Sequence, residues 1–442
     1  MPSPKSSSFA RLVENGFHAF GWDPAHRPDG QRRKADVVNL GFVVNVIESR
    51  HEREETLRVA WSFAERAMAV SAMLLVKADV SGQRPHGDGF LTSRSTFQKY
   101  YTQEELLSWV GETLSERAVS LAPGIVGVFR DKNLEQEAAY ARRSRAAMLT
   151  EKYSVPRRER AAAVPRPELV EVIAPILHDI WQAALELGRV PAQEELDRSV
   201  LDALARCRVS FRRAMQLLEG IHDFSALEAI ARARFDDLVV FGALSLFPGA
   251  PRYSSLSPRI QRDIRHFFGG HGTFVAKAAE ALDRLRDRSE LIRAFEGSVA
   301  IGAATYQNGT LSFAMRHESA LDVVIRIMIG CADIVSPGFA LCDAIDIGPS
   351  TTKLKGYFCQ DFDVPLPRLV TTLKVDLARQ SSRTLRIDDG VLYCRSRFLS
   401  SDDEDAVKQR SIDDRLVAAG IVDENCHGPT GKTLSKLLSK PK

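Results

Sequence analysis

The sequence lacks several features that would assign it directly to a class of protein. No apolar run is long enough to span a bilayer, and residues 1–8, rich in proline and serine, contain no apolar core of a secretory signal. The six cysteines include no C-x-x-C pair and lie too far apart for a zinc ribbon. We therefore expect a cytoplasmic protein with no membrane partner, whose cysteines are reduced and buried.

A strong charge of one sign and a cluster of metal ligands are also missing. The chain has 60 Lys and Arg residues against 57 Asp and Glu residues, and its formal net charge of +3 neither demands nor excludes a nucleic-acid partner. One histidine with two distant carboxylates, His317 with Asp361 and Asp363, is too little for a metal site. We predict no bound metal.

The length and the composition shifts predict several parts. With 442 residues the chain is long enough for two or three domains, each with its own core. We predict a partial α/β domain over 1–138, a basic linker over 139–167, a helical domain over 168–300, an α+β domain over 301–400 and a charged tail over 401–442. The proline-containing, arginine-rich composition of the linker is more common in a solvated helix and connector than in a phosphate-binding surface.

Two apolar segments near the N-terminus each lead to a polar side chain at the end of a predicted strand. Phe17–Trp22 predicts a strand that ends at Asp23, and Val37–Val44 predicts a buried parallel strand that contains Asn39 and Gly41. Ligands of open α/β sheets bind outside the carboxyl ends of the strands, where an acidic residue commonly holds a ribose hydroxyl. The stretch predicts half of a nucleotide-type cofactor site. The alternatives are a turn carboxylate for the aspartate and a satisfied strand-end amide for the asparagine.

Helix and strand signals alternate along the rest of the chain. In the first part we predict a helix opened by Ser49 and Glu52, a strand over 70–76, a helix opened by the capping box of Thr102 and Glu105, and an antiparallel hairpin over 118–129 around Pro123-Gly124. Farther on we predict helices over 168–247 with a break at 188–191, a helix from Ser257-Pro258 to Gly269, strands over 310–315, 370–377 and 391–394, a helix over 319–331 and a turn at 388–390.

The predicted order of strand, helix, strand, helix and terminal hairpin is that of the carboxyl half of S-adenosyl-L-methionine (SAM)-dependent methyltransferases. Local sequence narrows this class, because many short segments resemble the DNA phosphorothioation-associated methyltransferase family. In the first part these segments are 21–24, 35–47, 90–93, 96–102, 104–106 and 123–131. In the remainder they are 256–258, 262–265, 267–269, 316–317, 319–321, 330–332, 353–354, 361–363 and 375–377.

The resemblance implies a fold, a cofactor and partners. The expected fold is an incomplete Rossmann-like SAM-methyltransferase domain followed by a helical region and a C-terminal α+β domain. The expected cofactor is SAM, with DNA as substrate and proteins of a DNA phosphorothioation modification and restriction system as partners. In the cofactor site Asp23 would accept hydrogen bonds from the ribose, beside Trp22, Asn39, Leu40 and Gly41.

The sequence departs from the family pattern in two places. The glycine-rich turn that holds the methionine end of SAM would lie before Phe9, where it is missing, so we expect a shortened gene product or a mis-set start. Residues 39–42 lack the two prolines of the Asp/Asn-Pro-Pro-aromatic loop that exocyclic-amine methyltransferases use, and we assign no catalytic residue. The alternative hypothesis is a non-catalytic accessory protein that binds nucleic acid or a partner protein on a degenerate methyltransferase fold.

Two groups of side chains are candidates for contact with DNA. Arg94, Lys99 and Tyr100 combine cations with an aromatic ring, which suits phosphate contact and base stacking. Arg262 and Arg265 share the polar face of a predicted helix. The alternatives are a loop held by its aromatic rings in the first case and a solvated helix face in the second.

Overall fold

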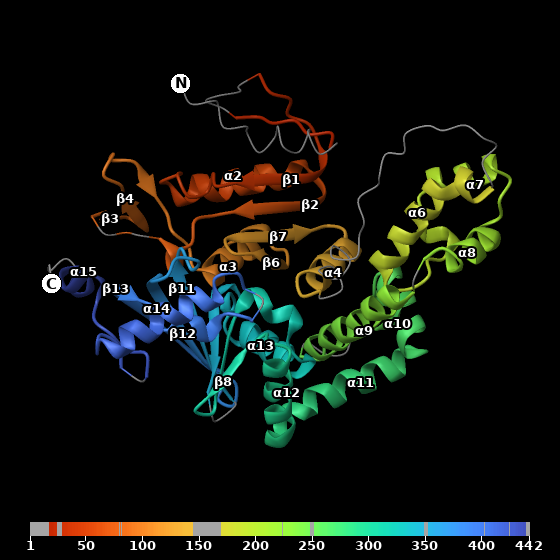
Figure 1. Ribbon diagram of the computed structural model, residues 1–442. Helices are drawn as coiled ribbons and strands as arrows, with labels where there is room; N and C mark the ends of the chain where they lie inside the picture. The colour runs from red at the N-terminus through yellow and green to blue at the C-terminus, as the bar shows by residue number, and fades with distance from the viewer. Residues whose placement is uncertain are drawn as a thin grey trace. The chain divides into compact units, whose positions relative to one another are not determined.

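The protein is a mixed α/β chain that divides into two compact units. The computed structural model describes residues 17–23, 29–78, 80, 82–144, 169–222, 224–247, 252–348, 352–401, 403–423 and 425–438 (Figure 1). The units are Met1–Glu135 and Gln136–Lys442, and each is treated separately. The finer five-part division stays a prediction, and most of its basic linker lies outside the described residues.

The first unit is built on a four-stranded sheet with the order β1-β2-β7-β6. Its strands are β1 (Ala35–Gly41), β2 (Ala64–Ser71), β6 (Ala118–Ala122) and β7 (Ile125–Phe129). β1 and β2 are parallel, whereas β7 is antiparallel to both of its neighbours. Parallel strands require a crossover connection, which helix α2 (Arg50–Phe63) provides. The predicted hairpin is confirmed.

Helices α2 and α3 (Gln103–Leu114) begin where their capping residues predict. The Ser49 side chain accepts a hydrogen bond from the Glu52 backbone N–H at 3.3 Å and caps α2. Thr102 and Glu105 form a reciprocal capping box at the start of α3. Apolar residues of both helices, including the fully buried Leu57, join the core of the sheet.

Two predicted strands of the first unit are wrong. Residues 17–22 form no strand, and the Phe17 and Trp22 side chains are 64% and 43% exposed, so the apolar run has no sheet neighbour to bury it. The strand predicted over 70–76 lies at 64–71, because the chain passes from α2 into β2 without a loop. The following apolar residues form the short 3-10 helix η1 (Leu75–Lys77).

A small three-stranded sheet that follows β2 was not predicted. It consists of β3 (Arg84–His86), β4 (Gly89–Leu91) and β5 (Phe97–Gln98), paired antiparallel. Beyond β5, Tyr101 forms a parallel bridge with Leu74. This bridge brings the chain back near the carboxyl end of β2 before α3 begins.

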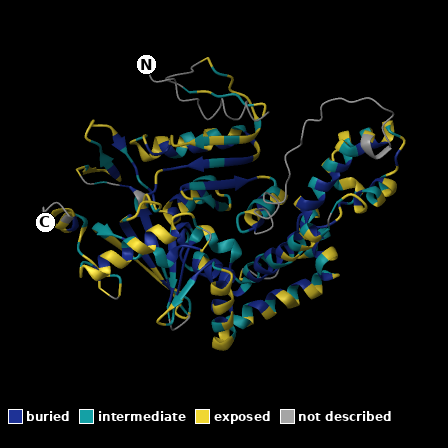
Figure 2. Ribbon diagram, in the orientation of Figure 1, coloured by how far each residue is buried: buried dark blue, intermediate teal, exposed yellow. Residues whose placement is uncertain are grey.

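The second unit begins with a helical part. Its helices are the end of α4 (Lys132–Ala141), then α6 (Leu169–Leu187), α7 (Arg198–Arg206), α8 (Phe211–Glu219), α9 (Ser225–Ser245), α10 (Pro258–Phe268), α11 (His271–Asp283) and α12 (Arg288–Ala300). Figure 2 shows these helices with alternating buried and exposed faces. The predicted break after α6 is confirmed, as is the α10 start, where Ser257 accepts from the Ile260 N–H at 3.3 Å. Gly269 ends α10 with φ 72°.

A six-stranded antiparallel sheet completes the second unit. It has the order β13-β12-β11-β10-β9-β8, with β8 (Thr305–Gln307), β9 (Thr310–Ala314), β10 (Ala344–Ile347), β11 (Lys353–Gln360), β12 (Arg368–Asp376) and β13 (Ser381–Val391). Helix α13 (Val323–Val335) contacts both α9 and β12, and every residue from Val324 to Ala332 is buried. Two further helices follow, α14 (Ala406–Ala418) and α15 (Gly431–Leu438).

The sequence places the last strand wrongly. The turn predicted at 388–390 and the strand predicted over 391–394 are replaced by one strand, β13, that continues through residues 388–390. Asp389 adopts φ 57° there, and the register between β12 and β13 shifts at Leu369 and Thr371. The turn-forming residues therefore occur inside the strand as an irregularity of the ladder.

Gly124 provides a test of the hairpin. It adopts φ 69°, and a β-carbon there would collide with the Ala72 carbonyl oxygen. We expect Gly124→Ala to lower the free energy of unfolding of the first unit by about 1–3 kcal/mol. Urea denaturation followed by tryptophan fluorescence measures this loss. Gly21→Ala is the matched control, because no atom lies within 4 Å of its added β-carbon. Equal stability of the two variants would contradict the steric argument.

Candidate functional site

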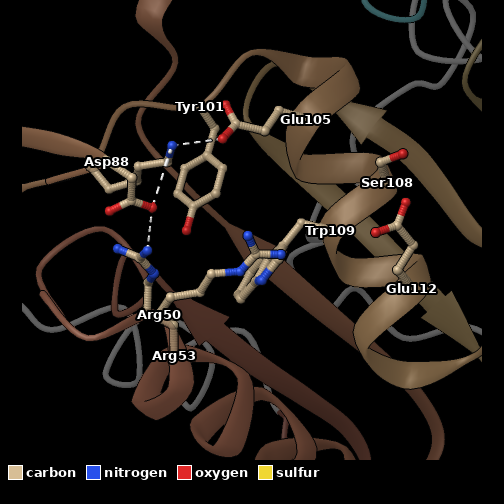
Figure 3. A pocket seen from close by; sticks show the side chains of 9 residues that line it. Arg50, Arg53, Asp88, Tyr101, Glu105, Ser108, Trp109 and Glu112 are labelled. Atoms are coloured by element: carbon tan, nitrogen blue, oxygen red, sulfur yellow. Dashed lines mark hydrogen bonds and ion pairs between the residues drawn. The ribbon is translucent and has the colours of Figure 1, made fainter.

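A cavity lies beyond the carboxyl ends of the two parallel strands of the first unit. Its volume is about 190 Å³ (Figure 3). The residues that line it are Arg50 and Arg53 of α2, Asp88, Lys99 and Tyr101 from the segment after β2, and Glu105, Ser108, Trp109 and Glu112 of α3. This is the position where open α/β sheets bind ligands. Complete small-molecule pockets measure about 300–1,000 Å³, so the cavity suits one part of a ligand.

Arg53 fixes one wall of the cavity. Its side chain is 2% exposed, and its Nη1 donates to the Ile47 carbonyl oxygen at 3.0 Å. Its Nη2 donates to the Asp88 carboxylate. A buried guanidinium needs such partners, because desolvation of an unpaired charge is costly. Arg53 therefore ties the loop after β1 to the small sheet that follows β2.

Lys99 belongs to the same group of charged side chains. Its Nζ lies 2.6 Å from the Glu105 carboxylate and 3.7 Å from that of Asp88. The Lys99 backbone N–H donates to the Asn45 carbonyl at 2.7 Å. The Asn45 side chain is fully buried, and its Oδ1 has no hydrogen-bond partner among the described residues. Cations and carboxylates thus alternate around the cavity.

Aromatic rings form the inner surface. Tyr101 is buried, and its ring centroid lies 5.7 Å from that of Trp109. Burial raises the pKa of the Tyr101 hydroxyl, which donates to the Val44 carbonyl at 3.5 Å. The phenol therefore stays protonated at neutral pH and contributes a neutral, ring-lined wall.

Two polar groups at the cavity have no structural partner. Ser108 and Glu112 are exposed, one turn apart on α3, and no described residue pairs with the hydroxyl or the carboxylate. Figure 3 shows both beside Trp109. A free carboxylate next to an aromatic wall can accept hydrogen bonds from the hydroxyl or amino groups of a ligand.

The cofactor residues predicted on β1 lie outside this cavity. Asn39 and Gly41 are exposed, whereas Val38 and Leu40 pack against the core of the first unit. The Asn39 side chain lies next to Gly41, since a β-carbon on the glycine would be 3.6 Å from Asn39 Nδ2. The structure thus brings these two polar positions together on one strand.

The other two predicted cofactor residues precede the sheet. Trp22 is partly exposed, with the Arg32 guanidinium 4.5 Å from its ring centroid. Asp23 is half-buried and already has an interaction partner. Neither lines the cavity. The ribose contact predicted for Asp23 stays a prediction.

Of the predicted DNA contacts, Lys99 alone lines the cavity. The Tyr100 hydroxyl accepts from Gln83 Nε2 at 3.0 Å, within the segment of the small sheet, and Arg94 lies on the exposed turn before β5. In the second unit, Arg262 lies 3.5 Å from the Glu195 carboxylate, and Arg265 is exposed in the last turn of α10.

Sequence reasoning missed most of the cavity. On α2 the buried residues recur every four positions, at Arg53, Leu57 and Trp61. The sequence therefore could have shown that Arg53 lies on the apolar face of this helix. Trp109 follows the same argument on α3. Asp88 had no local signal, because only the folding of the small sheet brings it to Arg53.

Comparisons with known proteins identified no family. No protein-family model matches the chain, and neither a curated protein nor a solved structure matches it. Within the described residues no helix is both long and apolar enough to cross a membrane. Nor do those residues place three or more His, Cys, Asp or Glu side chains where they could hold a metal ion.

Arg53 and Arg50 form a matched pair for testing the cavity wall. We expect Arg53→Met to lower the free energy of unfolding of the first unit by about 2–3 kcal/mol, because the Ile47 carbonyl and the Asp88 carboxylate lose their donor. Arg50→Met should change it by less than about 0.5 kcal/mol, since that side chain is 71% exposed. Urea denaturation of both variants measures the difference, and equal effects would contradict the assigned role of Arg53.

The buried charges near Arg262 predict an acid-sensitive contact in the second unit. Arg189 donates to both Glu195 oxygens at 2.7 Å, and chiefly these bonds lower the pKa of Glu195 to about 2 from 4.5. The stabilisation is complete above about pH 4.5 and is lost as the pH falls toward 2. At neutral pH the wild type should have a higher free energy of unfolding than Glu195→Gln. This difference should shrink as the pH falls from about 4.5 toward 2. Glu194→Gln, on the exposed neighbour, is the control; a pH-independent difference would contradict the linkage.

Proposed function

We propose that the chain is a SAM-dependent methyltransferase that acts on DNA in a DNA phosphorothioation modification and restriction system. The observation that carries the proposal is the order and direction of the strands in the first unit. A parallel pair joined by α2 is continued by an antiparallel hairpin whose second strand, β7, lies between β2 and β6. This arrangement supports the methyltransferase half that the family resemblance implies.

The exposed polar positions of β1 fit one end of SAM. The Asn39 amide has no partner among the described residues, and Gly41 leaves the backbone open to close approach. These two positions would meet the adenosine end, together with Asp23, Trp22 and Leu40. SAM would supply the methyl group, and the protein must align donor and acceptor and exclude water.

The cavity fits the acceptor better than the cofactor, because it is small, ring-lined and ringed by charges. Arg50 and Lys99 would attract the phosphate backbone of DNA, and the Tyr101 and Trp109 rings would contact a base. The Glu112 carboxylate, with which no described residue pairs, would accept the proton if the methylated group must lose one. Arg50, Lys99 and the two rings also have structural contacts, whereas no described residue pairs with the Glu112 carboxylate.

A non-catalytic accessory protein is the second candidate function. The observation that favours it is the separation of the two sites: none of Trp22, Asp23, Asn39, Leu40 and Gly41 lines the cavity. On this hypothesis the unit keeps the sheet and the charged cavity for binding nucleic acid or a partner protein.

Calorimetric titration with SAM separates the two functions. We expect saturable binding by the purified chain, about tenfold weaker in Asn39→Ala because one hydrogen bond is lost. Glu112→Gln should retain SAM binding but reduce methyl transfer to DNA. Asn133→Ala, an exposed amide on α4, is the control. Absence of heat at millimolar SAM, combined with DNA binding that weakens steeply with salt, would overturn the enzyme and support the accessory protein.

A further inference from the structure

Two cysteines from separate segments of the second unit meet at the end of β13. Cys394 lies directly before the 3-10 turn η7 (Arg395–Phe398), and Cys426 lies in the loop between α14 and α15. The two thiols interact with each other, and both side chains are half-buried. Cys331, Cys342 and Cys359 are buried instead. The expectation that the cysteines are buried therefore fails for this pair and for Cys207.

Contacts on both sides hold the two segments together. The hydroxyl of Tyr393, the residue before Cys394, donates to the Pro429 carbonyl at 2.6 Å. The Lys432 backbone N–H donates to the Asp389 carboxylate at 2.8 Å. Leu416, Val422 and Leu434 pack with Tyr393 in a small core beneath the loop. The thiols are thus held in place by the fold around them.

The surroundings make the two thiols chemically unequal. The hydrogen bond from Cys394 is the main cause that lowers the pKa of Cys426 to about 7, and the Arg397 guanidinium lowers it further. Burial and the carboxylates of Asp413 and Asp346 act in the opposite direction. The pKa of Cys394 is raised, because its proton is shared with its partner. Cys426 is therefore the more acidic of the two thiols and forms the thiolate more readily.

We propose that Cys394 and Cys426 form a redox-active dithiol that a hydroperoxide converts into a disulfide. The Cys426 thiolate attacks the terminal peroxide oxygen, the O–O bond breaks, and water or an alcohol leaves once the leaving oxygen is protonated. The resulting sulfenic acid is attacked by the Cys394 sulfur, which loses its proton as the S–S bond forms and a second water leaves. Two thiols are oxidised and one peroxide is reduced. This inference is independent of the proposed methyltransferase function.

The disulfide would close a covalent loop around α14. It would join the end of β13 to the loop before α15, across a segment now held by noncovalent contacts. A crosslink restricts the unfolded chain, so the oxidised protein should keep this segment docked under conditions that release it from the reduced protein.

Peptide mapping of the full-length chain tests the dithiol. The protein is reduced, desalted, treated with a small excess of hydrogen peroxide, alkylated and digested with trypsin without reduction. We expect a crosslink between the tryptic peptides 387–395 and 416–432, which contain Cys394 and Cys426. Cys207→Ser, which removes a half-buried cysteine far along the chain, should form the same crosslink.

Single variants test the order of the steps. In Cys394→Ser, the sulfenic acid on Cys426 should persist and be trapped by dimedone, whereas Cys426→Ser should react at least about tenfold more slowly at neutral pH. In the wild type the rate should rise with pH through about 7, as the Cys426 thiolate forms beside Arg397, Asp413 and Asp346. Oxidation of both cysteines no faster than that of Cys207, or crosslinks only between chains, would overturn the proposal.

Discussion

The parallel pairing of β1 with β2 is the constraint on which the first unit depends. A parallel pair cannot be joined by a tight turn, so the chain must return over the sheet, and α2 makes that return. The return places Arg53 in the first turn of α2, where its side chain is buried. The guanidinium is satisfied by the Ile47 carbonyl and the Asp88 carboxylate, one from each segment that follows a parallel strand. The crossover helix also contributes Arg50 and Arg53 to the lining of the cavity, so part of the cavity depends on the parallel pairing.

The second unit uses buried arginines in a related way. Arg326 of α13 is 1% exposed and pairs at 2.6 Å with Asp237 of α9, and Arg189 pairs at 2.8 Å with Asp263 of α10. Such pairs add little net stability, but removal of one partner leaves an uncompensated buried charge. Each pair joins segments far apart in the sequence. We therefore regard them as contacts that select one packing of the helices over others of similar apolar burial.

Capping residues and the Pro-Gly turn correctly predicted where several helices and one hairpin lie. The capping residues Ser49, Thr102 and Ser257 each begin a helix, and Pro123-Gly124 forms its hairpin, because a few neighbouring atoms decide these features. The apolar run from Phe17 failed as a strand, since a strand needs a neighbour that the sequence does not reveal.

Predictions that depended on distant neighbours failed or were missing. Asp388-Asp389-Gly390 has turn chemistry, but the β12 ladder holds it within β13. The cavity was missed for the same reason. Arg53 and Asp88 are 35 residues apart in the sequence. Their contact depends on the small three-stranded sheet, which was not predicted.

The residues that stabilise the fold of the first unit differ from some of the polar residues that line its cavity. The sheet order is maintained by backbone ladders and by the core around Leu57 and Val126, and these residues would be required whether or not the protein transfers methyl groups. Ser108 and Glu112 are different, because no described residue needs either of them for folding. The Glu112 carboxylate is exposed at the cavity, one turn from the Ser108 hydroxyl. Under the proposed function, the outer face of α3 supplies polar groups that no described residue pairs with.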